Sequence, residues 1–251
     1  MIRVEQLSKR YGERAAIDAV TMDVAAGEVH GFLGANGSGK TTTLKCITGL
    51  LHPDAGRVTI ADIDVAKDPV AARRQFGFLP ENQYLYPELT AAEYLRFLGR
   101  LRNVPDAAVA AHGERFLRVL ALAEFKEALI GGFSMGMKKK LALAGALLGD
   151  PSLVILDEPT NGMDPPAVAL FKDVIRELRK RGRTVLIASH HLDFVADLAD
   201  RCTLLEQGKV IARGTLEEWR QQAQLPNATL EQLFLKLTGR TLTDVAELFP
   251  S

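Results

Sequence analysis

Apolar and polar residues alternate differently in successive parts of the chain, and these patterns predict where strands and helices lie. Residues 1–60 have the pattern of short strands joined by glycine-containing turns, with one helix after Lys40. From about residue 84 to residue 148 the pattern becomes helical. The first part is therefore expected to form a small antiparallel sheet, and the second a helical lobe.

The helical stretch contains a recognisable helix start. Thr90 and Glu93 have the spacing of a capping box, in which the threonine hydroxyl and the glutamate carboxylate each accept a hydrogen bond from the other residue's amide. Further helices are predicted over 107–120 and 137–148. This stretch is expected to be an arm inserted into the sheet domain.

After Pro151 the pattern returns to strands and helices. The continuous apolar runs at 153–156 and 184–188 are typical of parallel strands that are covered on both faces. Between them a helix is predicted after Asp164, which can cap it. Residues 204–211 have the pattern of a hairpin. The sequence therefore predicts an α/β fold with a mostly parallel core sheet.

The predicted organisation is a single domain over residues 1–251. The 251 residues, 47% of them hydrophobic, are enough to bury a full core. The parts are expected to be a core with its small β subdomain (1–83 and 149–220), a helical subdomain (84–148) and a C-terminal helical tail (221–251).

Composition restricts the partners and the compartment. Basic and acidic residues both total 31, so no overall field favours nucleic acid, and no nucleic-acid partner is expected. Cys46 and Cys202 are far apart and signal neither a disulfide framework nor a zinc site, which is typical of a reducing cytoplasm. No run approaches the roughly 20 apolar residues needed to span a bilayer. Any membrane role would require a separate anchor.

Residues 34–41 match the phosphate-binding pattern G-x-x-x-x-G-K-[ST], between an apolar strand at 29–33 and a helix. In such a loop, glycines allow backbone amides to approach phosphate oxygens, Lys40 neutralises the terminal phosphates and Thr41 places its hydroxyl on Mg²⁺. The alternative, a glycine-rich turn with a solvated lysine, explains less. The predicted nucleotide-binding residues here are Gly34, Ala35, Asn36, Gly37, Ser38, Gly39, Lys40, Thr41 and Thr42.

Two carboxylates end the buried strand at 153–156. Asp157 and Glu158 would be costly there unless a cation or a reaction used them. Asp157 suits Mg²⁺ coordination through water, and Glu158 suits the general base that polarises an attacking water. The alternative is an ordinary strand end with solvated acids. Together with the loop at 34–41, these acids predict ATP hydrolysis with Mg²⁺.

Further stretches resemble the ATP-binding cassette family over essentially the whole chain. Residues 132–137 stand where that family has its signature, usually Leu-Ser-Gly-Gly-Gln. Residues 158–164 resemble the stretch from the catalytic glutamate into the D-loop, and His190 stands at the position of the switch histidine. Met135 and Met137 depart from the usual Gly and Gln. The resemblance implies a phosphate-loop NTPase core and two such domains, paired head to tail, with two ATP molecules between them.

The resemblance also implies roles for individual residues. Ser134 and Gly136 would grip the γ-phosphate of ATP held by the partner subunit. His190 would hydrogen-bond the γ-phosphate or the attacking water, with Glu158 as the catalytic carboxylate, and Tyr11 would stack on adenine. His191 is interpreted as a bystander, and the run of lysines at 138–140 as a solvated helix face.

One position differs from the family's usual pattern. Glu81 stands where the family usually has a Gln that touches Mg²⁺ directly after a strand, and Gln83 lies two residues further on. A carboxylate there can still bind Mg²⁺, although it adds negative charge near the phosphates. The hypothesis is that Glu81 is a metal ligand, and the sequence leaves open whether Glu81 or Gln83 takes the role.

The favoured function is the ATP-hydrolysing subunit of a membrane transporter. Residues 84–90 and 229–239 resemble cassettes of the drug, antibiotic and ion exporter group, which favours export. The expected partners are a second copy of the chain and a membrane-spanning permease, with the chain cytoplasmic and peripheral on the inner face of the cell membrane. The alternative is a soluble ATPase of the same family that acts on ribosomes or DNA. The transported substrate is not encoded in this chain.

Overall fold

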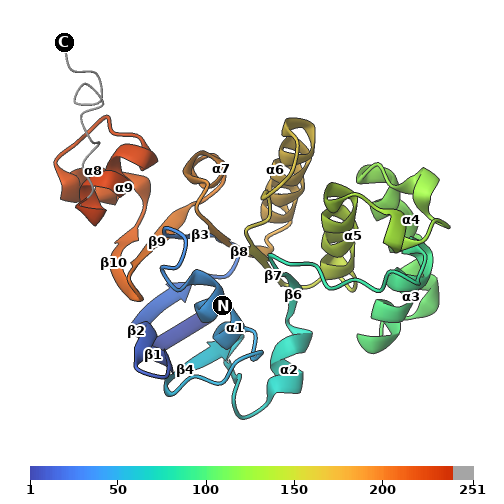
Figure 1. Ribbon diagram of the computed structural model, residues 1–251, viewed down its shortest axis with the longest axis horizontal. Helices are drawn as coiled ribbons and strands as arrows, with labels where there is room; N and C mark the ends of the chain where they lie inside the picture. Colours follow the sequence, from blue (N-terminus) through green and yellow to red (C-terminus); the bar gives the residue numbers. More distant parts are fainter. Residues whose placement is uncertain (240–251) are drawn as a thin grey trace.

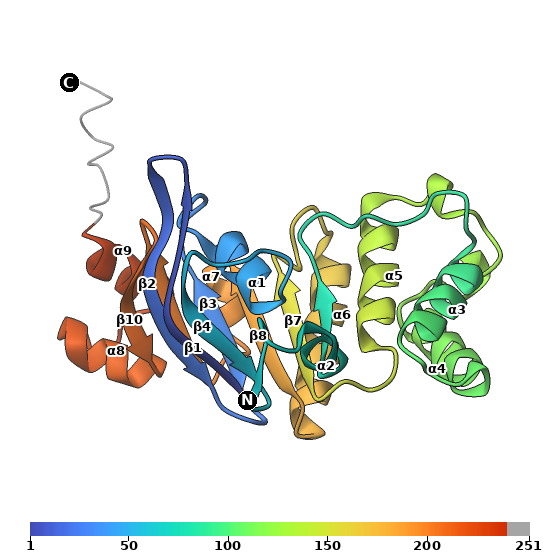
Figure 2. The same ribbon diagram turned by 90° about the horizontal axis from the view of Figure 1, so that it is seen from below.

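The computed structural model describes residues 1–239 and contains two sheets (Figures 1 and 2). The smaller sheet is antiparallel, in the order β2-β1-β4-β5. The larger sheet has the order β10-β9-β3-β8-β7-β6 and is parallel except for its β9–β10 edge. The strands are β1 (Ile2–Tyr11), β2 (Arg14–Val24), β3 (Val29–Leu33), β4 (Ala55–Ile60), β5 (Ile63–Asp64), β6 (Phe76–Leu79), β7 (Leu153–Asp157), β8 (Thr184–Ser189), β9 (Arg201–Glu206) and β10 (Lys209–Gly214).

Five of the described helices form two groups at the ends of the molecule, while α1, α2, α6 and α7 contact the sheets. Figure 1 shows α3, α4 and α5 gathered on one side of the molecule, with α8 and α9 at the opposite end. The described helices are α1 (Lys40–Ile47), α2 (Pro69–Arg74), α3 (Ala91–Leu101), α4 (Asp106–Val119), α5 (Met135–Leu147), α6 (Pro165–Lys180), α7 (Leu192–Ala196), α8 (Leu216–Ala223) and α9 (Leu230–Thr238), with 3-10 turns η1 (Ala123–Phe125) and η2 (Ile130–Gly132). None of the helices within residues 1–239 is long and apolar enough to cross a membrane.

The predicted fold class is confirmed: a mostly parallel sheet is combined with a small antiparallel sheet and helices. The capping box at Thr90 and Glu93 begins α3, and the hairpin turns at Gln207 and Gly208. The boundary proposed between 220 and 221 falls inside α8. This helix begins before that boundary because Thr215 and Glu218 form a capping box at its start. Residues 240–251 of the predicted tail lie outside the described residues.

Two apolar clusters hold the sheets in place. One lies between the two sheets and α1, and includes Phe32, Leu44 and Ile155. The other covers the opposite face of the large sheet and joins it to α5 and α6, through residues such as Leu141 and Phe171. Every residue of β3, β7 and β8 is buried, as their continuous apolar runs predicted.

The parallel strands bring three loops to one edge of the large sheet. Strand β8 lies between β3 and β7, with Leu33 opposite Ser189 and Asp157 opposite Ala188. The segments that follow these strands therefore begin side by side, at the edge where ligands bind in open α/β sheets. These are the segments that carry most of the predicted site residues.

Helix α5 packs closely on the edge strand β6, beside β7 (Figure 2). A Cβ atom at Gly77 of β6 would lie 1.8 Å from the carbonyl oxygen of Ala146 in α5, so only glycine permits this approach. Because the predicted signature residues lie at the start of α5, the contact between α5 and β6 fixes the position of these residues relative to the large sheet.

Candidate functional site

The predicted phosphate-binding loop, residues 34–41, joins β3 to α1. Gly39 precedes α1 with φ of 109°, and a Cβ atom there would lie 2.6 Å from the carbonyl oxygen of Ala16. Gly37 is also left-handed, with φ of 79°. The loop thus adopts a conformation that its glycines allow, and it presents the first amides of α1 to the pocket beside it.

The Lys40 side chain is 5% exposed and lies inside this loop. Its amine donates hydrogen bonds to the carbonyl oxygens of Gly34, at 2.8 Å, and Ala35, at 3.3 Å. It also lies 3.2 Å from the Glu158 carboxylate. A buried ammonium with a carboxylate partner at the mouth of a glycine-rich loop can exchange that partner for a phosphate.

A pocket of about 750 Å³ lies over this loop. The predicted site residues that line it come from β1, the loop, α1, the segment after β6 and the segment after β7. They are Tyr11, Asn36, Gly37, Gly39, Lys40, Thr41, Thr42, Glu81 and Glu158. Tyr11 is 54% exposed at the end of β1, so one ring face is free to stack on a flat group.

Asp157 and Thr41 meet beside this pocket, which Thr41 lines. The Thr41 hydroxyl donates a hydrogen bond to Asp157 across 3.4 Å. Burial and, to a smaller extent, the nearby carboxylates of Glu81 and Glu158 raise the pKa of Asp157 to about 6, although the hydrogen bond from Thr41 lowers it. A cation would stabilise the ionised form, and these oxygen ligands are the type that Mg²⁺ prefers. The donor set therefore fits this ion.

The Glu158 carboxylate has well-defined partners. One oxygen faces Lys40, and the other accepts hydrogen bonds from the Ser189 hydroxyl, at 3.1 Å, and the His190 amide, at 3.3 Å. Burial raises its pKa, but the side-chain hydrogen bond of the His190 ring and the charge of Lys40 outweigh this effect, so the pKa lies below its usual range. Glu158 is therefore ionised at neutral pH, as a general base must be.

Two histidines follow β8. Nδ1 of His190 lies 3.0 Å from the Glu158 carboxylate, and the rings of His190 and His191 lie 4.2 Å apart. Nε2 of His191 lies 2.9 Å from the side-chain oxygen of Asn161, on the segment after β7. Burial and the neighbouring His190 lower the pKa of His191. The ring of His191 therefore joins the segments after β7 and β8, and its interpretation as a bystander in the chemistry stays a prediction.

Glu81 and Gln83 point into different parts of the structure. Glu81 lines the pocket over the phosphate-binding loop. The Gln83 amide nitrogen instead donates to the carbonyl oxygens of Pro80, at 2.8 Å, and Glu81, at 2.7 Å, and its side chain lines a separate pocket beside Tyr84. The geometry therefore favours Glu81 for a role beside the phosphates.

Ser134 and Gly136 do not line the pocket that holds Lys40 and Glu158. Ser134 caps α5 by accepting a hydrogen bond from the Met137 amide, at 3.2 Å. Ser134 is exposed at this helix start, and Met135 beside it is 65% exposed. The first turn of α5 thus lies outside the lining of the chain's own pocket, and its exposed residues are accessible to a second molecule.

The lysine run at 138–140 is not a uniformly solvated face. Lys138 and Lys140 are partly exposed, but Lys139 is only 2% exposed, so the expectation is wrong for Lys139. The apolar residues Ala142 and Leu143 follow it at helical spacing and are buried. That spacing is a signal in the sequence that could have placed Lys139 on the buried face.

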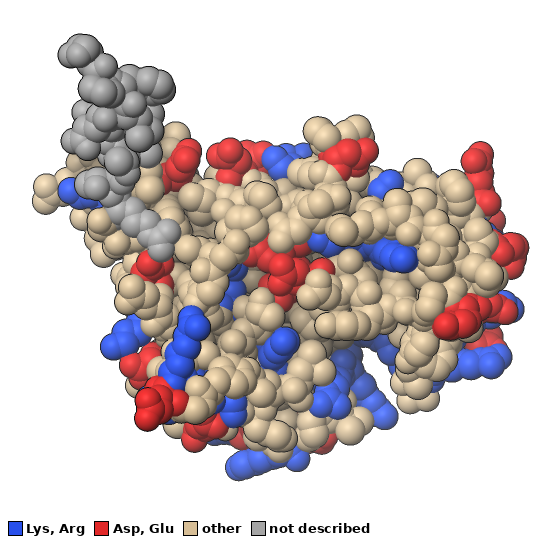
Figure 3. Space-filling view, viewed as in Figure 1, with Lys and Arg blue, Asp and Glu red and all other residues tan. Residues whose placement is uncertain are grey.

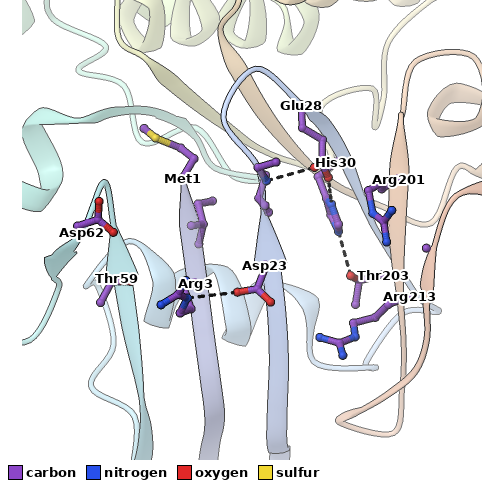
Figure 4. A pocket seen from close by; sticks show the side chains of 14 residues that line it. Met1, Arg3, Asp23, Glu28, His30, Thr59, Asp62, Arg201, Thr203 and Arg213 are labelled. Carbon is purple, nitrogen blue, oxygen red and sulfur yellow. Dashed lines mark hydrogen bonds and ion pairs between the residues drawn. The ribbon is translucent and has the colours of Figure 1, made fainter.

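A second pocket, of about 760 Å³, lies at the other end of β3 (Figure 4). His30 stands between Glu28 and Thr203, with Arg201 and Arg213 beside it. Both ring nitrogens of His30 are engaged, one with the Glu28 carboxylate and the other with the Thr203 hydroxyl at 2.9 Å. His30 therefore ties β3 to β9, and none of the predicted site residues lines this pocket.

Acidic and basic side chains are mixed over the face shown in Figure 3. Acidic groups gather near its centre, with basic groups close beside them, and both signs recur around the rim. This distribution agrees with the equal totals of 31 basic and 31 acidic residues.

Comparisons with known proteins support the interpretation of this pocket as a nucleotide site. The sequence profile of the family described as ABC transporter matches residues 17–161, and a profile of the AAA domain matches residues 126–197. The daunorubicin resistance ATP-binding protein DrrA3 of Streptomyces coeruleorubidus is 37% identical over 221 residues, which cover 88% of this chain and 70% of that protein. The ABC transporter ATP-binding protein NatA of Bacillus subtilis is 35% identical, over 86% of this chain and 90% of that protein.

Solved structures extend the likeness to the fold. The ATP-binding subunit of an ABC transporter superposes with a TM-score of 0.90 at 34% identity, covering 95% of this chain and 99% of that one. A dimeric ATP-binding cassette in a post-hydrolysis state with ADP and Pi superposes with a TM-score of 0.79 at 25% identity, covering 86% of this chain and 99% of that one. On this evidence, the chain belongs to the ABC transporter family and is an ATP-binding, ATP-hydrolysing subunit of a transporter.

Proposed function

We propose that this subunit powers export, and that hydrolysis takes place in the pocket between Tyr11 and Glu158. The observation that carries the site assignment is the contact of Lys40 with Glu158, at 3.2 Å, beside the glycine-rich loop. It puts the predicted phosphate ligand and the predicted base within one small space. Export is supported by the names of relatives, among them the daunorubicin resistance protein and a Nod factor export protein of Burkholderia lata that is 38% identical.

Each group has a role that its position supports. The amides of residues 34–39 and the Lys40 amine bind the phosphates, and Tyr11 stacks on the adenine. Thr41, Asp157 and Glu81 hold Mg²⁺, which neutralises charge on the phosphates when bound. Glu158 accepts the proton of the attacking water, and His190 holds that carboxylate in place.

The contact of Lys40 with Glu158 also makes the base depend on nucleotide. The ammonium group lowers the pKa of Glu158. When phosphate oxygens engage Lys40, that stabilisation of the carboxylate weakens and the phosphate adds a like charge, so the proton affinity of Glu158 rises. Nucleotide binding thus makes Glu158 a stronger base where the attacking water is to be deprotonated.

A second copy of the chain would complete the site. Ser134 and Gly136 begin α5 outside the chain's own pocket, where the Ser134 hydroxyl and the first amides of the helix suit an anion. We assign them to the γ-phosphate of ATP held by the partner copy. A membrane-spanning permease would hold the pair on the cytoplasmic face of the cell membrane and convert closing and opening into transport.

Transport in inverted membrane vesicles tests the direction. The chain is co-expressed with the membrane protein of the neighbouring reading frame. Daunorubicin serves as the probe substrate because one relative is named for resistance to this drug. ATP is expected to drive the drug into the vesicle lumen, and a Lys40→Met chain is expected to leave it outside. ATP-driven loss of drug from the lumen would indicate import. Sedimentation of the chain with ribosomes or DNA instead of vesicles would favour the soluble alternative.

Glu81→Ala is expected to raise the Mg²⁺ concentration needed for half-maximal hydrolysis by about tenfold, because one charged ligand of the ion is lost. Gln83→Ala is the matched control. Its side chain contacts backbone carbonyl groups instead of the pocket, so its Mg²⁺ requirement should not change. Titration of ATPase activity with Mg²⁺ measures both. An unchanged requirement in Glu81→Ala, or a raised one in Gln83→Ala alone, would remove Glu81 from the metal site.

A further inference from the structure

The buried lysine on α5 contacts the segment that carries Glu158. Lys139 is 2% exposed, and its amine donates hydrogen bonds to the carbonyl oxygens of Glu158, at 3.0 Å, and Asn161, at 2.9 Å. Burial lowers the pKa of this amine, and the charges of Glu81, Glu158 and Asp157 oppose that change. The structure thus keeps a cation where a neutral side chain would be easier to bury.

The backbone at Glu158 is in an unfavourable conformation. Its φ is 45°, in the left-handed region that residues other than glycine rarely adopt. Such a conformation persists only where its surroundings hold it. The Glu158 amide donates to Ala188 at 2.9 Å, which fixes one side of the residue. On the other side, the Glu158 carbonyl oxygen accepts the Lys139 hydrogen bond at 3.0 Å and a longer one, at 3.4 Å, from the Asn161 amide.

The direction of the Glu158 side chain depends on this backbone. A rotation of φ or ψ at Glu158 would swing the carboxylate away from Lys40 and His190, which lie 3.2 Å and 3.0 Å from it. Lys139 therefore acts on the carboxylate through the peptide, without lining the nucleotide pocket itself.

Asn161 is held from two directions. Its carbonyl oxygen accepts from Lys139, and its side-chain oxygen lies 2.9 Å from the His191 ring. These contacts join α5 to the segment after β7 and, through His191, to the segment after β8. Because α5 begins at the signature residues, a shift of this helix is carried to Glu158 by direct hydrogen bonds.

We propose that Lys139 is a positioning residue for ATP hydrolysis. It holds the Glu158 backbone in its left-handed conformation and couples the position of α5 to the orientation of the Glu158 carboxylate. This inference rests on the proposed role of Glu158 as the base.

Lys139→Met removes the amine and keeps most of the side-chain volume. The expected result is a fall in kcat of about ten- to a hundredfold, because a small misplacement of a reacting group has an effect of this size, with the KM for ATP within about twofold. Lys139→Gln retains N–H donors and should recover part of the loss. Lys140→Met is the matched control on the same helix, and its kcat should not change. Hydrolysis and thermal unfolding are measured for each full-length chain.

Combination with Glu158→Gln separates positioning from a structural role. If Lys139 acts through the carboxylate, Lys139→Met should add little to the loss already caused by Glu158→Gln. Multiplied losses, an unchanged kcat in Lys139→Met, or equal losses of ATP binding, kcat and thermal stability in both Lys139 variants would each overturn the proposal. Near-normal turnover in Glu158→Gln alone would instead overturn the role of Glu158.

Discussion

Lys40→Met is expected to abolish measurable ATP turnover and to weaken ATP binding by about 30-fold or more, because removal of a buried charged partner typically costs that much affinity. Lys40 is 5% exposed, and its amine lies among the carbonyl oxygens of Gly34 and Ala35 and the Glu158 carboxylate. All of these groups are acceptors and remain in Lys40→Met, whereas the ammonium group is lost. The incoming phosphates would then have no cation within the loop to pair with. Titration with a fluorescent ATP analogue and a phosphate-release assay measure the two effects.

The matched control for this change is Lys45→Met. Lys45 lies on the same helix, α1, but is exposed. Its loss changes the net charge equally without touching the pocket, so binding and turnover should remain near those of the unaltered chain. Since Lys40→Met also leaves the Glu158 carboxylate without its ammonium partner, thermal unfolding without nucleotide shows whether the variant is folded. Saturable binding of normal strength in a folded Lys40→Met chain would refute the assigned phosphate site.

Glu158→Gln is expected to slow hydrolysis by about a hundredfold or more, which is the usual contribution of a general base. The amide has nearly the shape of the carboxylate but cannot accept the proton of water at neutral pH. Binding should persist because Lys40 and the loop are unchanged. With the ATP retained, the paired state should be longer-lived, and size-exclusion chromatography with Mg-ATP should show more dimer than for the unaltered chain.

Glu177→Gln provides the comparison for this second variant. Glu177 is exposed on α6 and pairs with Arg181, which caps the C-terminal end of that helix, and neither residue lines the pocket. Glu177→Gln makes the same chemical change on the surface. The rate of hydrolysis and the fraction of dimer should therefore stay the same as in the unaltered chain. Single-turnover hydrolysis is the decisive measurement for Glu158→Gln because it does not depend on product release. A near-normal single-turnover rate would show that another group takes the proton.

Features encoded by contiguous residues were predicted well. The phosphate-binding loop is one unbroken stretch, and the strands at 153–156 and 184–188 are continuous apolar runs, so residues close in the chain suffice to identify them. The hairpin after residue 204 is local in the same sense. Where a local signal was overlooked, as with Thr215 and Glu218, the predicted boundary was displaced into a helix.

Other features depend on residues brought together from distant parts of the chain. Tertiary packing places Glu81, and not Gln83, on the lining of the nucleotide pocket. Contacts from β8 and α5 hold Glu158 at its left-handed φ. Lys139 lies among other lysines in the sequence, yet α5 buries it against carbonyl oxygens from beyond β7.

The fold class and the chemistry of the loop follow from the order of residues along the chain, because periodicity, glycine placement and a contiguous motif act over a few residues. Which charged groups lie in contact depends instead on how the strands and helices pack. Lys40 and Glu158 are far apart along the chain and lie 3.2 Å apart, because β3, β8 and β7 run in parallel and end at the same edge of the sheet. Because these charged side chains are buried at that edge, their contacts form ion pairs and shift their pKa values. The order of residues alone does not specify these contacts.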